Sequence, residues 1–298
     1  MSAPLRLMAV HAHPDDESSK GAATMARYVT EGHEVLVVTC TGGEEGSILN
    51  PAMDLPEVRA DLSAVRAREV AEAIAVLGVR QHRLGFTDSG WPDGGAPVPP
   101  GRFATVPLEQ GTERLVTVMR EFRPHVVVTY DENGGYPHPD HIRCHEVSVA
   151  AFDAAGDDRL FPAAGPPWTP LKLYYVHEWC ELRMRTFHTA LLAEGLDSPY
   201  HEWLDEWADK PGSTERITTR VPCGEHFPVR DRALLAHATQ IDPHSHWFAV
   251  PMRMQQRLWP TEDFELVRSH VDTESPENDL FTGVSAFCSR EREERIPG

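Results

Sequence analysis

The sequence predicts an α/β fold with a Rossmann-like, mostly parallel sheet flanked by helices. Through the first 150 residues, short β-branched apolar runs alternate with amphipathic helical stretches. That alternation is typical of βαβ units with right-handed crossovers. Past residue 160 the pattern becomes less regular, and we expect an irregular C-terminal α+β part that shapes a pocket.

The strands and helices of the first half can be assigned in order. Apolar runs of strand length lie at 5–10, 35–39, 84–86 and 126–130. Apolar residues at helical spacing predict helices at 18–31, 57–77 and 108–122. The first two end before Gly32 and Gly78, and glycine commonly terminates helices. Prolines exclude regular structure from 90–106.

In the second half we expect a strand at 171–176 and helices at 180–194 and 230–240. Residues 1–160 are expected to form a metal-binding catalytic half and residues 161–298 a substrate-pocket half, together making one compact unit. The charged tail, 271–298, is expected to be partly disordered.

The composition excludes several function classes. A net charge of −18 weighs against nucleic-acid binding, because phosphate backbones require clustered Lys and Arg. No apolar run approaches the ~20 residues of a membrane span, and no secretory signal is recognisable. Five scattered cysteines without a CxxC pair indicate reduced thiols. We therefore expect a cytoplasmic protein without membrane partners, and the sequence leaves its oligomeric state open.

The strand expected at 5–10 runs directly into the segment His11-Ala12-His13-Pro14-Asp15-Asp16-Glu17. Ligands bind at the carboxyl ends of strands in open α/β sheets. Imidazole and carboxylate groups together form the ligand set of zinc and similar metals. This segment therefore predicts one half of a metal site.

The other half is expected after the strand at 126–130. There Asp131-Glu132-Asn133-Gly134-Gly135-Tyr136 leads into Pro137-His138-Pro139-Asp140-His141. An ordinary surface loop with scattered histidines is the alternative interpretation. Two such clusters, each following a predicted strand, favour a shared site.

Three of these residues are expected to bind one metal ion, and the candidate ligands are His13, Asp16 and His141. They supply two nitrogens and a carboxylate and leave a position open for water. Zn²⁺ suits this set, and Fe²⁺ fits the same geometry.

The remaining polar residues of the two segments have expected catalytic roles. Asp15 is placed to act as general base toward a water that the metal acidifies. His138 is expected to act on the other side of the intermediate, with Asp140 orienting it. Tyr136 is a candidate donor to the oxyanion.

These motifs resemble the zinc-dependent deacetylases related to N-acetylglucosaminyl-phosphatidylinositol deacetylase, over most of residues 5–270. Within that superfamily, Asn133-Gly134-Gly135-Tyr136 and Thr41-Gly42-Gly43-Glu44 are similar to the mycothiol-pathway deacetylases and amidases. The resemblance implies the same metal ligands, base and intermediate-stabilising residues as the analysis above. The opening segment through Lys20 and Gly21 is most similar to the amidases.

The resemblance also implies substrate contacts. Arg66 and Glu69 would by themselves be interpreted as a solvated ion pair on a helix, but in the deacetylases an arginine here binds sugar hydroxyls. Asp88 is a good turn residue that by resemblance also contacts glucosamine, and Glu44 could do likewise.

Two further residues are candidate substrate contacts. Lys20 would by itself be a surface lysine, yet in the family a lysine here accompanies the amidases. His244 is expected to line the pocket, and the role of the nearby His237-Ala238-Thr239-Gln240 segment does not follow from the sequence.

The implied reaction is hydrolysis of the cysteinyl–glucosamine amide of a mycothiol S-conjugate. It would release an N-acetylcysteine S-conjugate and glucosaminyl-inositol. The alternatives are deacetylation of N-acetyl-glucosaminyl-inositol and a related step on an antibiotic-pathway intermediate that bears mycothiol. A sugar-binding module without catalysis is the non-enzymatic alternative. The expected partner is thus a small pseudodisaccharide thiol conjugate.

Overall fold

The sheet of this computed structural model, which describes residues 3–92, 95–207 and 213–294, has seven strands in the order β3-β2-β1-β4-β5-β7-β6. The first five strands in this order are parallel, whereas β7 is antiparallel to both of its neighbours. The strands are β1 (Arg6–His11), β2 (Glu34–Thr41), β3 (Arg80–Phe86), β4 (Val126–Thr129), β5 (Lys172–His177), β6 (Thr219–Pro222) and β7 (Thr261–Ser269).

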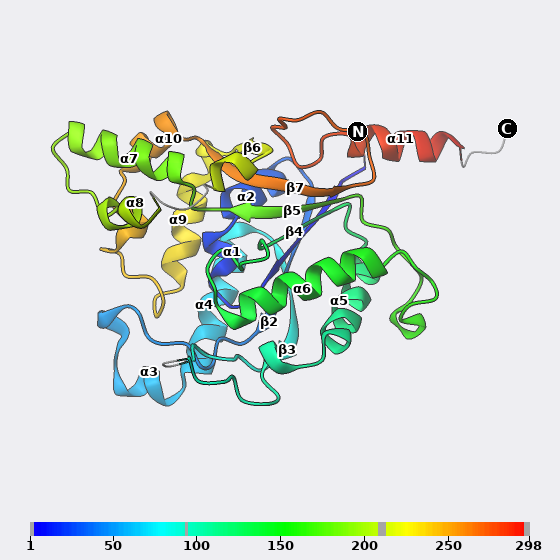
Figure 1. The fold of residues 1–298 in the computed structure, drawn as a ribbon, viewed down its shortest axis with the longest axis horizontal. Helices are drawn as coiled ribbons and strands as arrows, with labels where there is room; N and C mark the ends of the chain where they lie inside the picture. Colours follow the sequence, from blue (N-terminus) through cyan, green and yellow to red (C-terminus); the bar gives the residue numbers. More distant parts are fainter. Residues whose placement is uncertain (1–2, 93–94, 208–212, 295–298) are drawn as a thin grey trace.

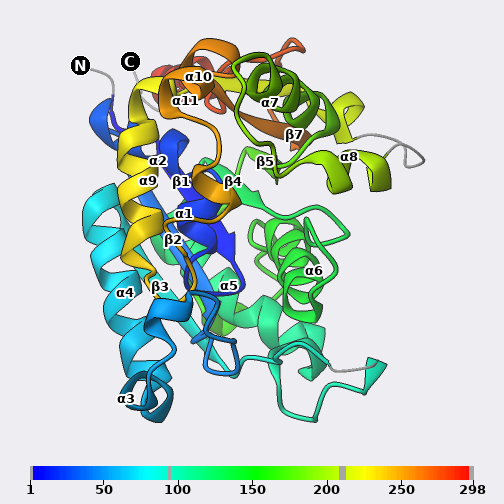
Figure 2. The same cartoon turned by 90° about the vertical axis from the view of Figure 1, so that its left-hand side faces the viewer.

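Helices cover both faces of the sheet (Figures 1 and 2). One face packs against α2 (Ala22–Thr30), α4 (Leu62–Leu77), α9 (Phe227–Ala236) and α11 (Val284–Glu294). The other packs against α5 (Leu108–Phe122) and α6 (Pro139–Ala154). Alternate residues of β1 serve the two cores, since Leu7 and Ala9 face the first group and Met8 and Val10 the second. The sheet is therefore buried on both sides, as the apolar strand sequences predict.

A smaller lobe extends beyond the carboxyl end of β5 (Figure 1). It contains α7 (Glu181–Ala193), α8 (His201–Trp207) and α10 (Met252–Leu258), which share a third apolar cluster centred on Met184 and Phe187. The short helices α1 (Asp16–Ser19) and α3 (Pro56–Ala60) lie in the connections that follow β1 and β2.

The α/β class and the helix at 108–122 are confirmed. Two predicted helices are each divided in the structure. The backbone leaves the helix at Asp61, where φ is −146°, and again at Lys20 and Gly21. Strands β6 and β7 have no counterpart in the sequence-based assignment. Strand β7 pairs antiparallel with β5, and β6 pairs antiparallel with β7. The mixed polar composition of both strands hides them from pattern analysis.

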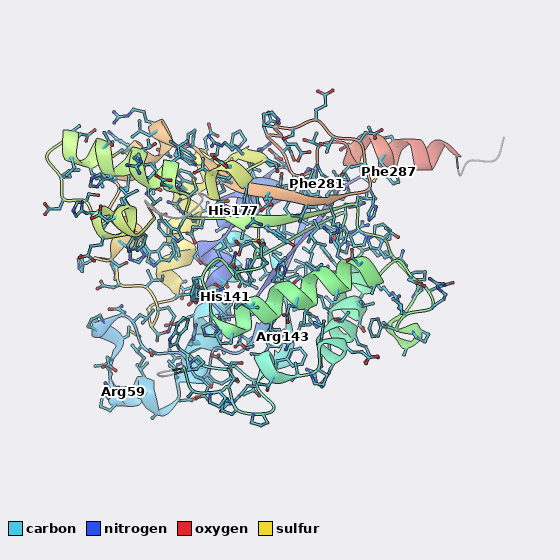
Figure 3. All side chains as sticks on the ribbon, viewed as in Figure 1. Arg59, His141, Arg143, His177, Phe281 and Phe287 are labelled. Atoms are coloured by element: carbon cyan, nitrogen blue, oxygen red, sulfur yellow. The ribbon has the colours of Figure 1, made fainter. Side chains whose placement is uncertain are left out.

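The tail from residue 271, for which partial disorder is expected, packs against the sheet in the first part of its described residues. Leu280 and Val284 are fully buried and Phe281 is nearly so, and they pack beside β1 and α2. Figure 3 shows Phe281 and Phe287 near the start of α11. Burial of these side chains outweighs the charged composition of the tail.

No helix among the described residues is both long enough and apolar enough to cross a membrane.

Candidate metal centre

The two motifs meet because β1 and β4 are neighbours in the sheet, with Leu7 paired to Val126 and Ala9 to Val128. Both chains run in the same direction, so the segments that follow them leave the sheet at one edge. The first segment turns into α1 and the second into α6. His141 lies in the first turn of α6, and Figure 3 shows it at that end of the helix.

The ligand atoms of His13, Asp16 and His141 converge on one point. The two histidine nitrogens, Nδ1 of His13 and Nε2 of His141, are 3.3 Å apart. Asp16 Oδ2 lies 3.7 Å from the first and 3.4 Å from the second. Tetrahedral bonds of about 2.0–2.1 Å separate ligand atoms by roughly 3.3 Å. The three residues, all buried, therefore fit a single zinc-like ion.

Hydrogen bonds on the far side of each ring determine which nitrogen would face a bound ion. His13 Nε2 lies 3.2 Å from Asp140 Oδ2 and 3.4 Å from Asp88 Oδ1. His141 Nδ1 is 2.9 Å from the carbonyl oxygen of Gly134. A ring N–H directed at these acceptors leaves the other nitrogen with its lone pair free for the metal.

The structure corrects the expected role of Asp140. Its carboxylate bonds His13 and accepts hydrogen bonds from the amide and hydroxyl of Ser89. His138 instead accepts a hydrogen bond at Nδ1 from the Asp140 backbone amide, at 3.1 Å. As the residue at the start of α6, His138 thereby caps the helix. The Asp140 side chain orients His13, while its main chain orients His138.

Asp16 is held by three donors. Tyr130 donates its hydroxyl to Oδ2 at 2.7 Å, the His13 amide donates to the same oxygen, and Lys20 Nζ lies 2.7 Å from Oδ1. Burial disfavours the carboxylate, but Lys20 and His141 keep the pKa of Asp16 well below its usual range. Asp16 is thus an anion at neutral pH.

The site attracts positive charge. Burial disfavours the imidazolium of His13, but hydrogen bonds to Asp140 and Asp88 outweigh it and raise the pKa of His13 to about 10. A buried position that stabilises a proton this strongly also stabilises a cation bound in its place. The electrostatics and the donor set therefore agree.

Replacing Asp140 with asparagine is expected to weaken zinc binding about 10- to 100-fold, because the anionic partner of His13 is lost. Competition for Zn²⁺ with a chromophoric chelator measures the change. The matched control is Asp153→Asn, which alters an exposed residue of the same helix. Equal affinities for Asp140→Asn and the wild-type protein would contradict the assignment.

Asp15 has an unusual backbone. Its φ is 111°, in the left-handed half of conformational space that residues other than glycine rarely adopt. Arg66 Nη2 lies 3.2 Å from Asp15 Oδ2. Burial raises the pKa of Asp15 although Arg66 opposes it. Compared with a free aspartate, this carboxylate is a stronger base.

Arg66 and Glu69 do not form a solvated ion pair. Both are buried. Arg66 donates to the carbonyl oxygens of Gly43 and Pro14 as well as to Asp15. Glu69 accepts from the amide and hydroxyl of Thr239. The helical spacing that suggested a surface pair instead places both side chains on the inner face of α4.

His138 and Tyr136 lie over the same centre. Their ring centroids are 5.5 Å and 4.5 Å from that of His141. Burial and the neighbouring histidines lower the pKa of His138 to about 4. The ring is therefore neutral at pH 7, and with Nδ1 accepting from Asp140 its hydrogen lies on Nε2. Tyr136 is 46% exposed, stacks on Trp91, and can reach a bound ligand.

The expected substrate contacts separate into two groups. Lys20, Arg66 and Asp88 each contact His13, Asp15 or Asp16 directly, and Glu44 joins them by accepting from the Asp88 amide at 3.0 Å. His244 is exposed in the loop after α9 and its amide bonds Asp242.

Two further groups belong to the site and are not among the sequence-predicted site residues. Tyr130 lies at the end of the predicted strand, and its hydroxyl joins Asp16 to the Ala12 amide. His237 forms a buried ion pair with Glu17 of the opening motif. The position of Tyr130 at a strand end next to the second motif was a usable signal, whereas the pairing of His237 requires the tertiary fold.

Comparisons with known proteins identify the family of this chain. The model of the family PIG-L: GlcNAc-PI de-N-acetylase matches residues 8–152. A mycothiol S-conjugate amidase of Streptomyces coelicolor is 52% identical, covering 95% of this chain and 99% of the relative. The chain belongs to the PIG-L family. A deacetylase from Geodermatophilus obscurus, named for 1D-myo-inositol 2-acetamido-2-deoxy-α-D-glucopyranoside, is 41% identical over 95% of this chain and 99% of its own length.

Solved structures share the fold of this chain over most of its length. The N,N'-diacetylchitobiose deacetylase of Pyrococcus horikoshii superposes with a TM-score of 0.60 at 16% identity, covering 88% of this chain and 84% of that one. A conserved protein of Thermus thermophilus gives 0.56 at 23% identity, covering 91% and 96%. At these identities the likeness concerns the fold alone.

Proposed function

We propose that this PIG-L protein is a metal-dependent amidase that hydrolyses the cysteinyl–glucosamine amide of mycothiol S-conjugates. The observation that carries the proposal is the 52% identity to the Streptomyces amidase over nearly the full length of both chains. The convergent ligand atoms and the intact base support it. The products would be an N-acetylcysteine S-conjugate and glucosaminyl-inositol.

The ion is proposed to be one Zn²⁺ per chain, bound by His13, Asp16 and His141. Two nitrogens and one carboxylate also accept Fe²⁺. When bound, such an ion acidifies water and polarises a carbonyl group. Cys40 and Cys144 are buried side by side as thiols, and this supports the cytoplasm as the proposed compartment.

Asp15 is proposed to take the proton from the attacking water. Arg66 occupies its Oδ2 atom, so Oδ1 is the oxygen available to accept. The raised pKa of Asp15 suits both halves of the cycle. The carboxylate accepts the water proton readily, and the resulting carboxylic acid can pass it to the departing amine.

His138 and Tyr136 are proposed to stabilise the oxyanion. The neutral His138 ring donates from Nε2, and Tyr136 donates its hydroxyl. Burial and nearby carboxylates raise the pKa of Tyr136 far above its usual value, so the phenol remains a donor at any physiological pH. The exposure of Tyr136 lets it close over a bound substrate.

Arg66, Asp88 and Glu44 are proposed to contact the glucosamine, as they do by resemblance. Lys20 is proposed to contact the part of the substrate that distinguishes a conjugate from an acetylated sugar. Its ammonium group lies against Asp16, and the Lys20 side chain is 13% exposed. His244 stays a weaker proposal because it lies apart from this group.

The second candidate is the deacetylase activity named for the relatives that are 36–41% identical. The purified zinc protein is expected to turn over a mycothiol bimane conjugate at least about 10-fold more efficiently than N-acetyl-glucosaminyl-inositol, in kcat/KM, since a mispaired polar contact costs at least that much. Mass detection of both products measures the ratio. A reversed ratio would establish the deacetylase instead.

Lys20→Ala should reduce that preference about 10-fold, because a charged hydrogen-bond donor to the substrate is lost. Zinc content must be measured alongside, since Lys20 also contacts Asp16. Neither of the other two lysines can serve as a control. Lys210 lies outside the described residues, and Lys172 is buried in an ion pair with Glu277. The appropriate control is therefore Lys20→Arg, which keeps the charge and should retain part of the preference.

A further inference from the structure

The segment His237-Ala238-Thr239-Gln240 follows α9 and connects three parts of the catalytic half. His237 Nε2 lies 2.6 Å from Glu17 Oε1. Thr239 bonds Glu69 of α4 through its amide and hydroxyl. Gln240 donates to the carbonyl oxygen of Ser47 at 3.0 Å. A short turn from the second half of the chain thus holds the opening motif, α4 and the loop after β2.

The pair of Glu17 and His237 is enclosed, as neither side chain is exposed to solvent. The second carboxylate oxygen of Glu17 accepts the backbone amide of Asp15 at 3.0 Å. His237 Nδ1 has no hydrogen-bond partner among the described residues. The His237 ring therefore bonds the carboxylate of Glu17, and this carboxylate also accepts a hydrogen bond from the main chain of Asp15.

That main chain is the strained one. A φ of 111° at a non-glycine residue persists only where surrounding contacts hold it. Arg66 holds the Asp15 side chain and the carbonyl of Pro14, whereas Glu17 holds the Asp15 amide. The amides of Ser18 and Ser19 hold the Asp15 carbonyl, so loss of the Glu17 contact frees the amide side of Asp15. Relaxation there toward an ordinary φ would turn the carboxylate away from the centre.

We propose that His237 is a positioning residue, which acts through Glu17 to keep Asp15 in its strained, reactive orientation. The inference rests on the proposed function in assigning Asp15 as the base. His237 contacts none of the proposed metal ligands directly. Its effect should therefore fall on the rate of the chemical step and spare both substrate and metal binding.

The test compares His237→Ala with His237→Gln. Alanine removes the imidazole that pairs with the buried Glu17 carboxylate, while the Ser18 hydroxyl and the Asp15 amide can still donate to it. Glutamine presents an amide N–H near the place of Nε2 and keeps the hydrogen bond. We expect alanine to lower kcat about 10- to 100-fold, with KM and zinc content within about 3-fold of wild type. Glutamine should recover at least half of the decrease in log kcat that alanine causes.

The matched control is His201→Ala, since His201 is an exposed histidine on α8. It should retain wild-type kcat. The proposal is overturned if His237→Ala keeps wild-type kcat, or if alanine and glutamine lower kcat and zinc content to the same extent. The second result would make the residue a general element of folding.

A crystal structure of His237→Ala provides a readout that does not depend on the substrate. We expect Asp15 to adopt a negative φ and to lose its contact with Arg66. An unchanged Asp15 would overturn the proposal even if activity fell. If the wild-type protein cleaved neither the conjugate nor the acetylated sugar, the proposed function would fail, and this structure would still decide the positioning role.

Discussion

Asp15→Asn is expected to lower kcat/KM about 10³-fold while the protein keeps its zinc, because the amide cannot accept the water proton. The change is nearly isosteric, so Arg66 and the Asp15 amide can keep their hydrogen bonds. Steady-state assays with the mycothiol conjugate, together with metal analysis of the same sample, measure both quantities.

The control for this variant is Asp158→Asn, which changes an exposed aspartate and should leave the rate unchanged. Zinc-loaded Asp15→Asn with near wild-type activity would remove Asp15 from the role of base. Unaltered binding of the substrate with no turnover would also separate the enzyme from a sugar-binding module, for which Asp15 has no chemical task.

His141→Ala is expected to abolish activity at stoichiometric zinc, with affinity for the ion reduced more than about 100-fold. A three-residue site that loses one nitrogen ligand retains too few protein ligands to compete with chelators. The measurement is equilibrium dialysis followed by metal analysis. In the wild-type protein, a strong chelator should remove activity and added Zn²⁺ should restore it.

His145→Ala is the matched control, since His145 lies one turn further along α6 and bonds the Tyr130 carbonyl. The sequence spacing alone makes His145 an alternative ligand. Among the described residues, however, His145 is absent from the cluster of His13, Asp16 and His141 and from the other cluster that could hold a metal ion, His13, His138 and Asp140. Zinc loss from His145→Ala, with zinc retained by His141→Ala, would reverse the assignment.

The sequence was sufficient for the part of the fold that depends on local pattern. The helix at 108–122 has one apolar face and one charged face, and it ends where predicted. Strands β6 and β7 could not be predicted, because their residues are mixed in polarity. Their pairing depends on the edge of β5, to which β7 pairs, and β6 then pairs with β7. Tertiary packing also ordered the tail around Phe281, which composition alone does not reveal.

For the site, topology made the sequence informative. Two motifs at the ends of parallel strands had to meet if those strands were neighbours, and β1 and β4 are. The histidine that the Asp140 side chain contacts could not be predicted in this way. Whether Asp140 bonds His138 or His13 depends on how the first turn of α6 is rotated, and the spacing of residues in the sequence does not determine that rotation.

Strand β4 has consequences for any attempt to shorten the protein. A fragment of residues 1–160 would contain every proposed metal ligand, yet the β4 edge that pairs with β5 would be open. Exposed strand edges of this kind recruit other chains. The fragment would also lack His237, leaving Glu17 a buried charge without its counter-ion. Such a truncated protein should aggregate during expression, and thus the smallest workable unit for biochemistry is nearly the whole chain.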